Sequence, residues 1–120
     1  MSKLLIYQYP KCGTCRNAVK WLQSKGHELE MRNIFEEPPT VSELTVLIEK
    51  SSLDLKKFFN VSGEVYKEMG LKDKLQNMSR DEQIALLSSN GRLIKRPIVS
   101  NGEHVTVGYK EEQYAEVWGN

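Results

Sequence analysis

The opening third of the chain alternates between two kinds of hydrophobic pattern, and their order constrains the fold more than any other feature. Leu4 to Tyr7 is an almost continuous apolar run, typical of a strand buried on both faces in a parallel or mixed sheet. Pro10 ends this strand. A helix follows, because apolar residues then recur at helical spacing, at Cys15, Ala18, Val19 and Leu22. Leu29 and Met31 alternate with polar residues and predict a second strand. A right-handed parallel crossover is the default for this order.

Residues 40 to 92 are predicted to form a helical block. Thr40 and Glu43 have the spacing of a capping box, and Ser79 and Glu82 repeat it ahead of a second apolar run. Gly91 is expected to end that last helix. Two further short helices are expected in between, one closing at Phe58 and Phe59 and one carrying Val65, Tyr66 and Met69 before Gly70.

After residue 92 the period changes to that of a hairpin. Ile98 and Val99 are followed by Asn101-Gly102, which suits a two-residue type I′ turn, and then by alternating Val105 and Val107. A short amphipathic helix over Tyr114, Val117 and Trp118 is expected next. The fold class is therefore α/β, a small mixed sheet of about four strands flanked by helices, with a helical insertion at about 40–92.

Composition narrows the class of protein. The 120 residues fit a single domain, 1–120, with 39% hydrophobic residues and no low-complexity tract. The net charge of +1 does not indicate the excess of basic residues that direct nucleic-acid binding requires. The longest apolar run is far too short to span a membrane, and the first residues predict a strand and not a signal peptide. We expect a cytoplasmic monomer with no membrane contact.

The only two cysteines, Cys12 and Cys15, stand at the predicted strand-to-helix junction. A structural zinc site needs four ligands, and only the distant His27 and His104 could complete one, so no metal or other cofactor is predicted. An inert pair is an alternative, because Cys15 has a helix-periodic position that suits a small core residue. Cys12, however, lies just before the helix, where free backbone N–H groups and the helix dipole favour a thiolate.

A reactive dithiol is the interpretation that we favour, with Cys12 as nucleophile and Cys15 as resolving thiol. Gly13 allows the chain to bend, so that Cys15 can reach back one turn later. Lys11 and Arg16 add positive charge nearby. The turn "KCGTCR" is accordingly the expected anion- or substrate-binding segment, with Lys11, Gly13, Thr14 and Arg16 as its candidate residues.

Four segments, "YPKCGTCRNAVKWL", "NIFEEPP", "LKKFFNVSG" and "KRPI", together resemble the arsenate-reductase-like (ArsC) branch of the thioredoxin superfamily, and most closely its Spx/MgsR group. The resemblance runs through essentially the whole chain in order. It implies a thioredoxin-like fold with a helical insertion. It also implies that Pro97 matches the cis-proline opposite the dithiol, as a further substrate-binding residue, and that Arg96 belongs to the catalytic group.

The resemblance implies two different activities. Arsenate reductases of this family have a cysteine at the position of Cys12 and arginines that hold the oxyanion. Arg96 matches one of these arginines, but Asn60 and Tyr109 fall at the other two, and neither offers a charged fork, which argues against arsenate reduction. Regulators of the Spx type use the cysteine pair as a redox switch and bind the RNA polymerase α subunit.

The sequence thus favours a thiol–disulfide oxidoreductase or thiol-dependent reductase. Its expected electron donor is a low-molecular-weight thiol or a protein of the thioredoxin or glutaredoxin type. The alternative is a redox-switched transcriptional regulator that binds RNA polymerase rather than DNA. Both hypotheses depend on Cys12, Cys15 and Arg96.

Overall fold

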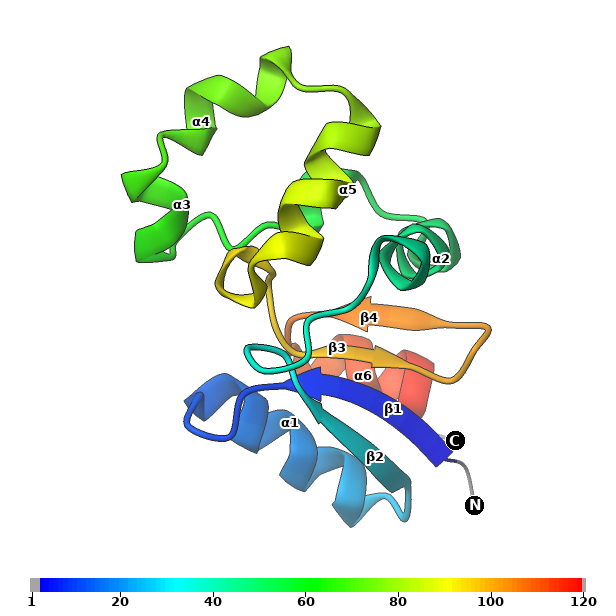
Figure 1. Cartoon of the computed structure of the whole chain (residues 1–120). Helices are drawn as coiled ribbons and strands as arrows, with labels where there is room; N and C mark the ends of the chain where they lie inside the picture. The colour runs from blue at the N-terminus through cyan, green and yellow to red at the C-terminus, as the bar shows by residue number, and fades with distance from the viewer. Residues whose placement is uncertain (1–2, 120) are drawn as a thin grey trace.

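A computed structural model describes residues 3–119 and contains one four-stranded mixed sheet (Figure 1). The strands are β1 (Lys3–Gln8), β2 (Glu28–Asn33), β3 (Ile98–Ser100) and β4 (Val105–Val107). Their order across the sheet is β2-β1-β3-β4, with β2 parallel to β1 and β3 antiparallel to both β1 and β4. The predicted α/β class, the number of strands and the parallel first crossover are confirmed.

Helices cover the sheet on both faces, as Figure 1 shows. The helices α1 (Gly13–Ser24) and α6 (Glu111–Trp118) lie on one face. The insertion lies on the other. It comprises α2 (Val41–Ser51), the 3₁₀ helix η1 (Leu55–Phe58), α3 (Glu64–Glu68), α4 (Leu71–Lys74), the 3₁₀ helix η2 (Leu75–Asn77), α5 (Arg80–Ser89) and the 3₁₀ helix η3 (Gly91–Leu93). The helical block predicted at about 40–92 is therefore confirmed.

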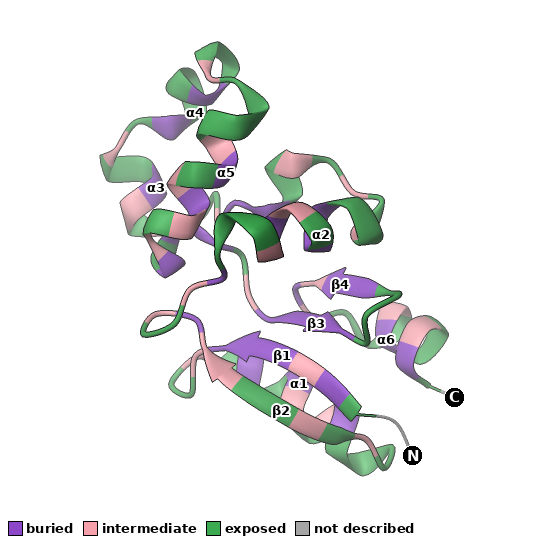
Figure 2. Cartoon of the chain, turned by 45° about the vertical axis from the view of Figure 1, so that its right-hand side comes forward, coloured by how far each residue is buried: buried purple, intermediate pink, exposed green. Residues whose placement is uncertain are grey.

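The strands divide the core in two because successive side chains point to opposite faces of a sheet. Leu4 and Ile6 of β1 belong to one cluster of buried residues, together with α1 and α6. Tyr7, the next residue along, belongs to a second cluster formed with the insertion. Figure 2 shows the resulting pattern: β1, β3 and β4 are mostly buried, whereas β2 is largely exposed or half-exposed.

Both predicted capping boxes are present at the starts of α2 and α5. The hydroxyls of Thr40 and Ser79 accept hydrogen bonds from the backbone N–H groups of Glu43 and Glu82, each at 3.1 Å. The two glutamate carboxylates accept in return from the backbone N–H groups of the cap residues. These local bonds satisfy N–H groups that have no partner inside the helix.

Two details of the prediction are wrong. Gly91 does not end α5 in a left-handed conformation, since Asn90 is the C-cap residue and Gly91 already belongs to η3. The hairpin turn is not centred on Asn101-Gly102: the Asn101 N–H donates to the carbonyl of His104, so the turn residues are Gly102 and Glu103. The second strand predicted from Leu29 and Met31 is present as β2, an edge strand in which Met31 is 52% exposed.

Each of these two differences, at Gly91 and at the hairpin turn, has a physical reason. A Cβ atom at Gly91 would lie 1.9 Å from the carbonyl oxygen of Ile34, so the glycine is required by close backbone packing and not by its φ angle. In the hairpin, the side-chain oxygen of Asn101 accepts from the backbone N–H groups of Glu103 and His104. This Asx-type turn keeps Asn101 out of the left-handed region and leaves only Gly102 with positive φ.

A short backbone ladder joins the insertion to the segment that enters β3. Phe59 and Ile94 form an isolated antiparallel bridge. The N–H of Asn60 donates to the carbonyl of Leu93 at 2.7 Å, and the N–H of Lys95 donates to the carbonyl of Phe58 at 2.8 Å. These bonds hold residues 57–60 beside residues 93–96. Within the described part of the chain, no helix combines the length and the apolar character needed to cross a membrane.

Candidate functional site: a cysteine pair beside a cationic cavity

Cys12 and Cys15 lie at the start of α1, one helical turn apart. Cys12 is the N-cap residue, and its backbone is held in a turn: its N–H donates to the carbonyl of Tyr9 and its carbonyl accepts from the N–H of Arg16, each at 3.0 Å. Its side chain is half-exposed, whereas the side chain of Cys15 is 0% exposed. Both are free thiols in this structure. Cys12 is therefore the solvent-accessible cysteine of the pair, and Cys15 is the buried one.

The surroundings of Cys12 favour its thiolate. Partial burial opposes ionisation, but the backbone N–H and the thiol of Cys15, the positive charge of Arg96 and the backbone N–H of Thr14 outweigh it, so the pKa of Cys12 is lowered. The N–H groups of Thr14 and Cys15 lie near the Cys12 sulfur and favour its thiolate, although their geometry is not that of a capping hydrogen bond. The N–H groups at the start of α1 are nevertheless available to a negative charge.

Cys15 has the opposite character. Burial against the core raises the pKa of its thiol to about 12, and the hydrogen bond that this thiol donates to Cys12 and the negative charge there add to the increase. At neutral pH Cys15 is therefore a protonated thiol and a hydrogen-bond donor to its neighbour. The pKa values of the two cysteines shift in opposite directions because Cys12 is half-exposed at the start of the helix and Cys15 is buried.

Arg96 reaches this pair from the opposite side of the site. It precedes β3, and the peptide bond between Arg96 and Pro97 is cis, as the family resemblance implies. The guanidinium carbon lies 4.9 Å from the centre of the Phe35 ring, and the Tyr9 ring stacks on Phe35 with 4.2 Å between the ring centres. The Nε atom of Arg96 is buried without a hydrogen-bond partner among residues 3–119. An anion bound beside Cys12 would give the Nε–H group of Arg96 a hydrogen-bond acceptor.

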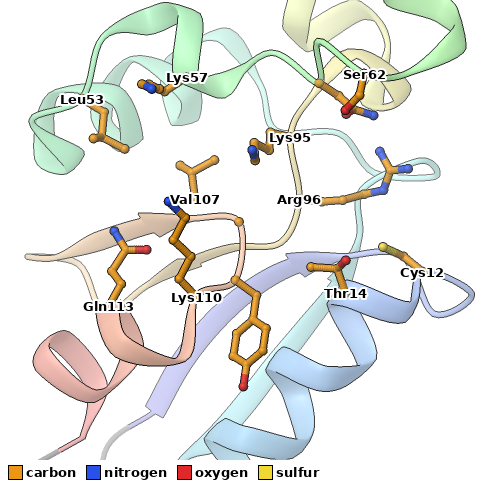
Figure 3. A pocket seen from close by; sticks show the side chains of 13 residues that line it. Cys12, Thr14, Leu53, Lys57, Ser62, Lys95, Arg96, Val107, Lys110 and Gln113 are labelled. Carbon is orange, nitrogen blue, oxygen red and sulfur yellow. The ribbon is translucent and has the colours of Figure 1, made fainter.

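A cavity of about 500 Å3 opens next to Cys12, between the sheet and the insertion (Figure 3). Three parts of the chain contribute to it: the start of α1, the insertion around η1, and the segments flanking the hairpin. Four of its lining residues are cations and, in the part of the chain that the structure describes, none is an acid. The lining residues are Cys12, Thr14, Leu53, Lys57, Asn60, Ser62, Lys95, Arg96, Val107, Gly108, Tyr109, Lys110 and Gln113.

The structure brings together only some of the residues predicted for the site. Cys12, Thr14 and Arg96 line the cavity, and Cys15 lies buried behind Cys12. Lys11, Gly13 and Arg16 are exposed on the turn and on α1, and Pro97 is buried, and none of these four is among the lining residues within 3–119. Asn60 and Tyr109, which the resemblance places where arsenate reductases have arginines, do line the cavity.

Sequence reasoning did not single out Lys57, Lys95 and Lys110. They come from the end of η1, the segment before β3 and the N-cap of α6, and no local spacing relates them. The one available signal was weak: Lys57 lies in "LKKFFNVSG" and Lys95 in "KRPI", two of the segments that carry the family resemblance. Among the described residues no three His, Cys, Asp or Glu side chains are grouped as a metal site requires.

Comparison with known proteins identifies the class to which this fold and this cysteine pair belong. The model of the ArsC family matches residues 7–117, which include the dithiol, the insertion and Arg96. The chain belongs to the ArsC family. The crystal structure of a protein from Bacteroides fragilis, described as related to the ArsC family, superposes with a TM-score of 0.90, at 49% identity over 94% of this chain and 95% of that one.

Relatives of known sequence extend the comparison. The uncharacterized protein YusI of Bacillus subtilis is 58% identical over 96% of this chain and 98% of its own length. The regulatory protein MgsR of the same organism is 27% identical over 89% of this chain and 83% of its own. An arsenate reductase of Acidiphilium multivorum is 32% identical over 82% of this chain and 69% of its own. Global transcriptional regulators named Spx match at comparable identity.

Proposed function

We propose that this protein is a thiol–disulfide oxidoreductase or thiol-dependent reductase in which Cys12 is the nucleophile and Cys15 the resolving thiol. The observation that carries the proposal is the contrast between the two cysteines. Cys12 is half-exposed at the mouth of a cationic cavity with a lowered pKa, and Cys15 is buried behind it with a raised pKa. A dithiol that reacts in a fixed order needs this asymmetry.

The reaction proceeds in two balanced exchanges. The Cys12 thiolate attacks one sulfur of a disulfide, so that a mixed disulfide with Cys12 forms and the other half leaves as a thiolate. Cys15 then loses its proton to the departing group and attacks the Cys12 sulfur, closing the Cys12–Cys15 disulfide and releasing the second half as a thiol. The substrate gains two electrons and the protein loses two. An external thiol donor reverses the oxidation.

Arg96 has two roles in this scheme. Its positive charge contributes to the lowered pKa of Cys12. Its guanidinium also lines the cavity beside the reacting sulfur, where it would bind the anionic part of a substrate or a leaving thiolate. The donor that we propose is a low-molecular-weight thiol or a protein of the thioredoxin or glutaredoxin type, since Cys12 is accessible from solvent.

A coupled turnover assay tests the proposal on wild type, Cys12→Ser and Cys15→Ser. Each protein is offered a small mixed disulfide and, separately, arsenate, with a glutathione system or a thioredoxin system as donor. We expect disulfide turnover in the wild type, none in Cys12→Ser, and little with arsenate because Asn60 and Tyr109 replace two cationic ligands. Absence of turnover with every donor would reject the enzyme.

A second candidate function is a redox-switched regulator that binds the RNA polymerase α subunit. Its support is the similarity to MgsR and to Spx 1 of Lactococcus lactis, each over about nine tenths of this chain. In this case the same disulfide opens and closes without turnover. Two results would favour the regulator: a Cys12–Cys15 disulfide that forms reversibly in a protein inactive in the assay, and binding to the isolated C-terminal domain of the polymerase α chain in only one redox state.

A further inference from the structure

The cavity beside Cys12 has two ends. Cys12, Thr14 and Arg96 lie at one end, and Figure 3 shows Lys57, Lys110 and Gln113 at a distance from them, at the other end, with Lys95 in between. Lys57 comes from the insertion, and Lys110 and Gln113 come from the start of α6. The second end is therefore built from elements far from the cysteines in sequence.

In the described part of the chain, the charged side chains that line the cavity are all positive. Its four cations are balanced by no acidic side chain among the described lining residues. Glu111 and Glu112 follow Lys110 directly and line a neighbouring depression that Lys110 also borders, but neither glutamate is among the described lining residues of the cavity beside Cys12. The salt bridges that the structure describes join Lys3 to Glu30 and Arg32 to Glu43, so none of the four cavity cations takes part in them. The positive potential of the cavity is thus available to a ligand.

The cavity is too large to be filled by a single compact ion. About 500 Å3 is in the range of cavities that enclose small organic molecules and is far more than one tetrahedral oxyanion fills. The polar groups among the cations, namely Thr14, Asn60, Ser62 and Gln113, offer hydrogen bonds along its length. Leu53 and Val107 add apolar contact suited to a short carbon chain.

We infer that the substrate is the disulfide of a low-molecular-weight thiol whose carboxylate, several bonds from the sulfur, binds Lys57 and Lys110. This inference rests on the proposed function and names the substrate class of the same site. Lys57 and Lys110 are specificity residues: they hold the distant carboxylate while the disulfide lies against Cys12. The exchange is then Cys12–S⁻ + R–S–S–R → Cys12–S–S–R + R–S⁻, with R carrying the carboxylate.

Three disulfides built on one skeleton test the inference. N,N′-Disuccinylcystamine carries a carboxylate at the far end of each arm, N,N′-diacetylcystamine is its neutral analogue, and cystamine itself is cationic. The rate constant of each with the reduced protein is divided by its rate constant with a free small thiol in the same buffer, which removes differences in intrinsic reactivity. We expect the normalised rate of the disuccinyl compound to exceed that of the diacetyl compound by about tenfold at low salt.

Variants then assign the preference to the two lysines. Lys57→Gln and Lys110→Gln are each expected to lower the normalised rate of the disuccinyl compound by about threefold and to leave that of the diacetyl compound unchanged. Lys67→Gln, an equal loss of charge at an exposed position of α3 outside the cavity, is the matched control and should change neither rate. Added salt should reduce the disuccinyl preference.

The outcomes separate the inference from the proposed function. Equal normalised rates for the disuccinyl and diacetyl compounds, or a preference that survives in both lysine variants, would overturn the substrate class while the dithiol chemistry stands. If Cys12 reacts with none of the three disulfides, the proposed function fails and the inference fails with it.

Discussion

The contrast between Cys12 and Cys15 shows how burial, at the scale of single residues, decides chemistry. Both are thiols in the same helical turn, and the same arginine acts on both. Cys12 keeps contact with solvent and with N–H groups that favour its thiolate, whereas Cys15 has lost its solvent altogether. The proposed order of reaction, Cys12 first and Cys15 second, rests on this difference.

The pH dependence of Cys12 reactivity is the first prediction. Because the pKa of Cys12 is lowered, its thiolate persists below the pH at which an ordinary thiol ionises, so its alkylation rate should reach a plateau at a lower pH than that of a free thiol. The buried Cys15, with a pKa of about 12, stays protonated and contributes nothing to the fast phase. The rate of iodoacetamide labelling against pH measures this directly.

Arg96→Gln should shift the same profile to higher pH, because a positive charge that favours the thiolate is removed. We expect labelling near pH 7 to slow by roughly threefold. Arg92→Gln is the matched control: Arg92 lies over the same Phe35 ring, at 4.6 Å, but does not line the cavity. An Arg96 profile identical to that of the Arg92 variant would contradict the role given to Arg96.

The sequence singled out the two cysteines that the proposed reaction uses, but not the lysines at the distant end of the cavity. A cysteine spacing and a strand-to-helix junction are local, so Cys12, Cys15 and Thr14 could be predicted from a few residues. Lys11 and Arg16 were predicted to belong to the same site, yet both are exposed and neither is among the described lining residues of the cavity. Whether a charge near a cysteine in sequence is near it in space depends on the direction of the side chain, which spacing does not specify.

At the scale of elements, the start of α2 is tied to the sheet by one carboxylate. Glu43 accepts from Thr40 in the capping box, from Arg32 of β2 at 2.7 Å and from the hydroxyl of Tyr7 of β1 at 3.2 Å. Arg32 also lies over the Tyr7 ring, 5.0 Å from its centre. Burial raises the pKa of Tyr7 to about 12, so its hydroxyl remains a donor. One residue thereby anchors the insertion to two strands.

The free energy of unfolding, measured as the pH is lowered, tests the contribution of the Glu43 carboxylate. Burial alone would raise the pKa of Glu43, but its bonds to Thr40, Arg32 and Tyr7 prevail and lower it. A lowered folded-state pKa means that the stabilisation is present above the unfolded pKa of about 4.3 and is lost as pH falls through the folded value. Glu43→Gln should lower the free energy of unfolding at pH 7 by about 1 kcal/mol and flatten its decline below pH 5.

Glu82→Gln is the control for Glu43→Gln in denaturant titrations at pH 7 and pH 4. Glu82 has the same place in the second capping box, but the structure gives its side chain no ion pair within the described residues. Its replacement should therefore change stability less than that of Glu43 at neutral pH. Equal effects of the two substitutions would show that the cap alone matters and that the tie to Arg32 and Tyr7 contributes nothing.

Gly91→Ala is predicted to be strongly destabilising. The added methyl group would lie 1.9 Å from the carbonyl oxygen of Ile34, and neither backbone can move without disturbing η3 or the turn that follows β2. We expect a loss of more than about 2 kcal/mol in the free energy of unfolding, measured by chemical denaturation. Gly13→Ala adds the same methyl where no atom lies within 4 Å, so it should leave stability nearly unchanged or raise it slightly.

The elements themselves could be predicted where their signals are local. The structure contains both predicted capping boxes, the buried first strand and the hairpin. The signal for each of them comes from neighbouring residues in the sequence. The role of Gly91 could not be predicted, since its partner Ile34 lies 57 positions earlier in the sequence. The hairpin turn moved by one residue because the Asn101 side chain bonds to the backbone of the loop, a choice that the Asn-Gly pair alone does not determine.

At the scale of the whole molecule, the cavity lies where the insertion meets the start of α1 and the segments that flank the hairpin. The bonds between residues 58–60 and 93–95 bring Lys57 and Asn60 beside Lys95 and Arg96, and the hairpin returns the chain to Tyr109 and Lys110 on the far wall. The family resemblance predicted this architecture and placed Asn60 and Tyr109 near the thiol. The set of cations that makes the cavity positive emerges only when three distant segments meet.

The intact mass of the protein after a brief reaction with N,N′-diacetylcystamine tests the central claim most directly. Wild type should lose two hydrogens and carry no adduct, because Cys15 resolves the mixed disulfide. Cys15→Ser should stop with one half of the reagent attached at Cys12, and Cys12→Ser should react slowly or not at all. If Cys12→Ser instead gained an adduct at Cys15 as fast as the wild type reacts, or if the wild type kept its adduct, the assigned order of the two cysteines would be wrong.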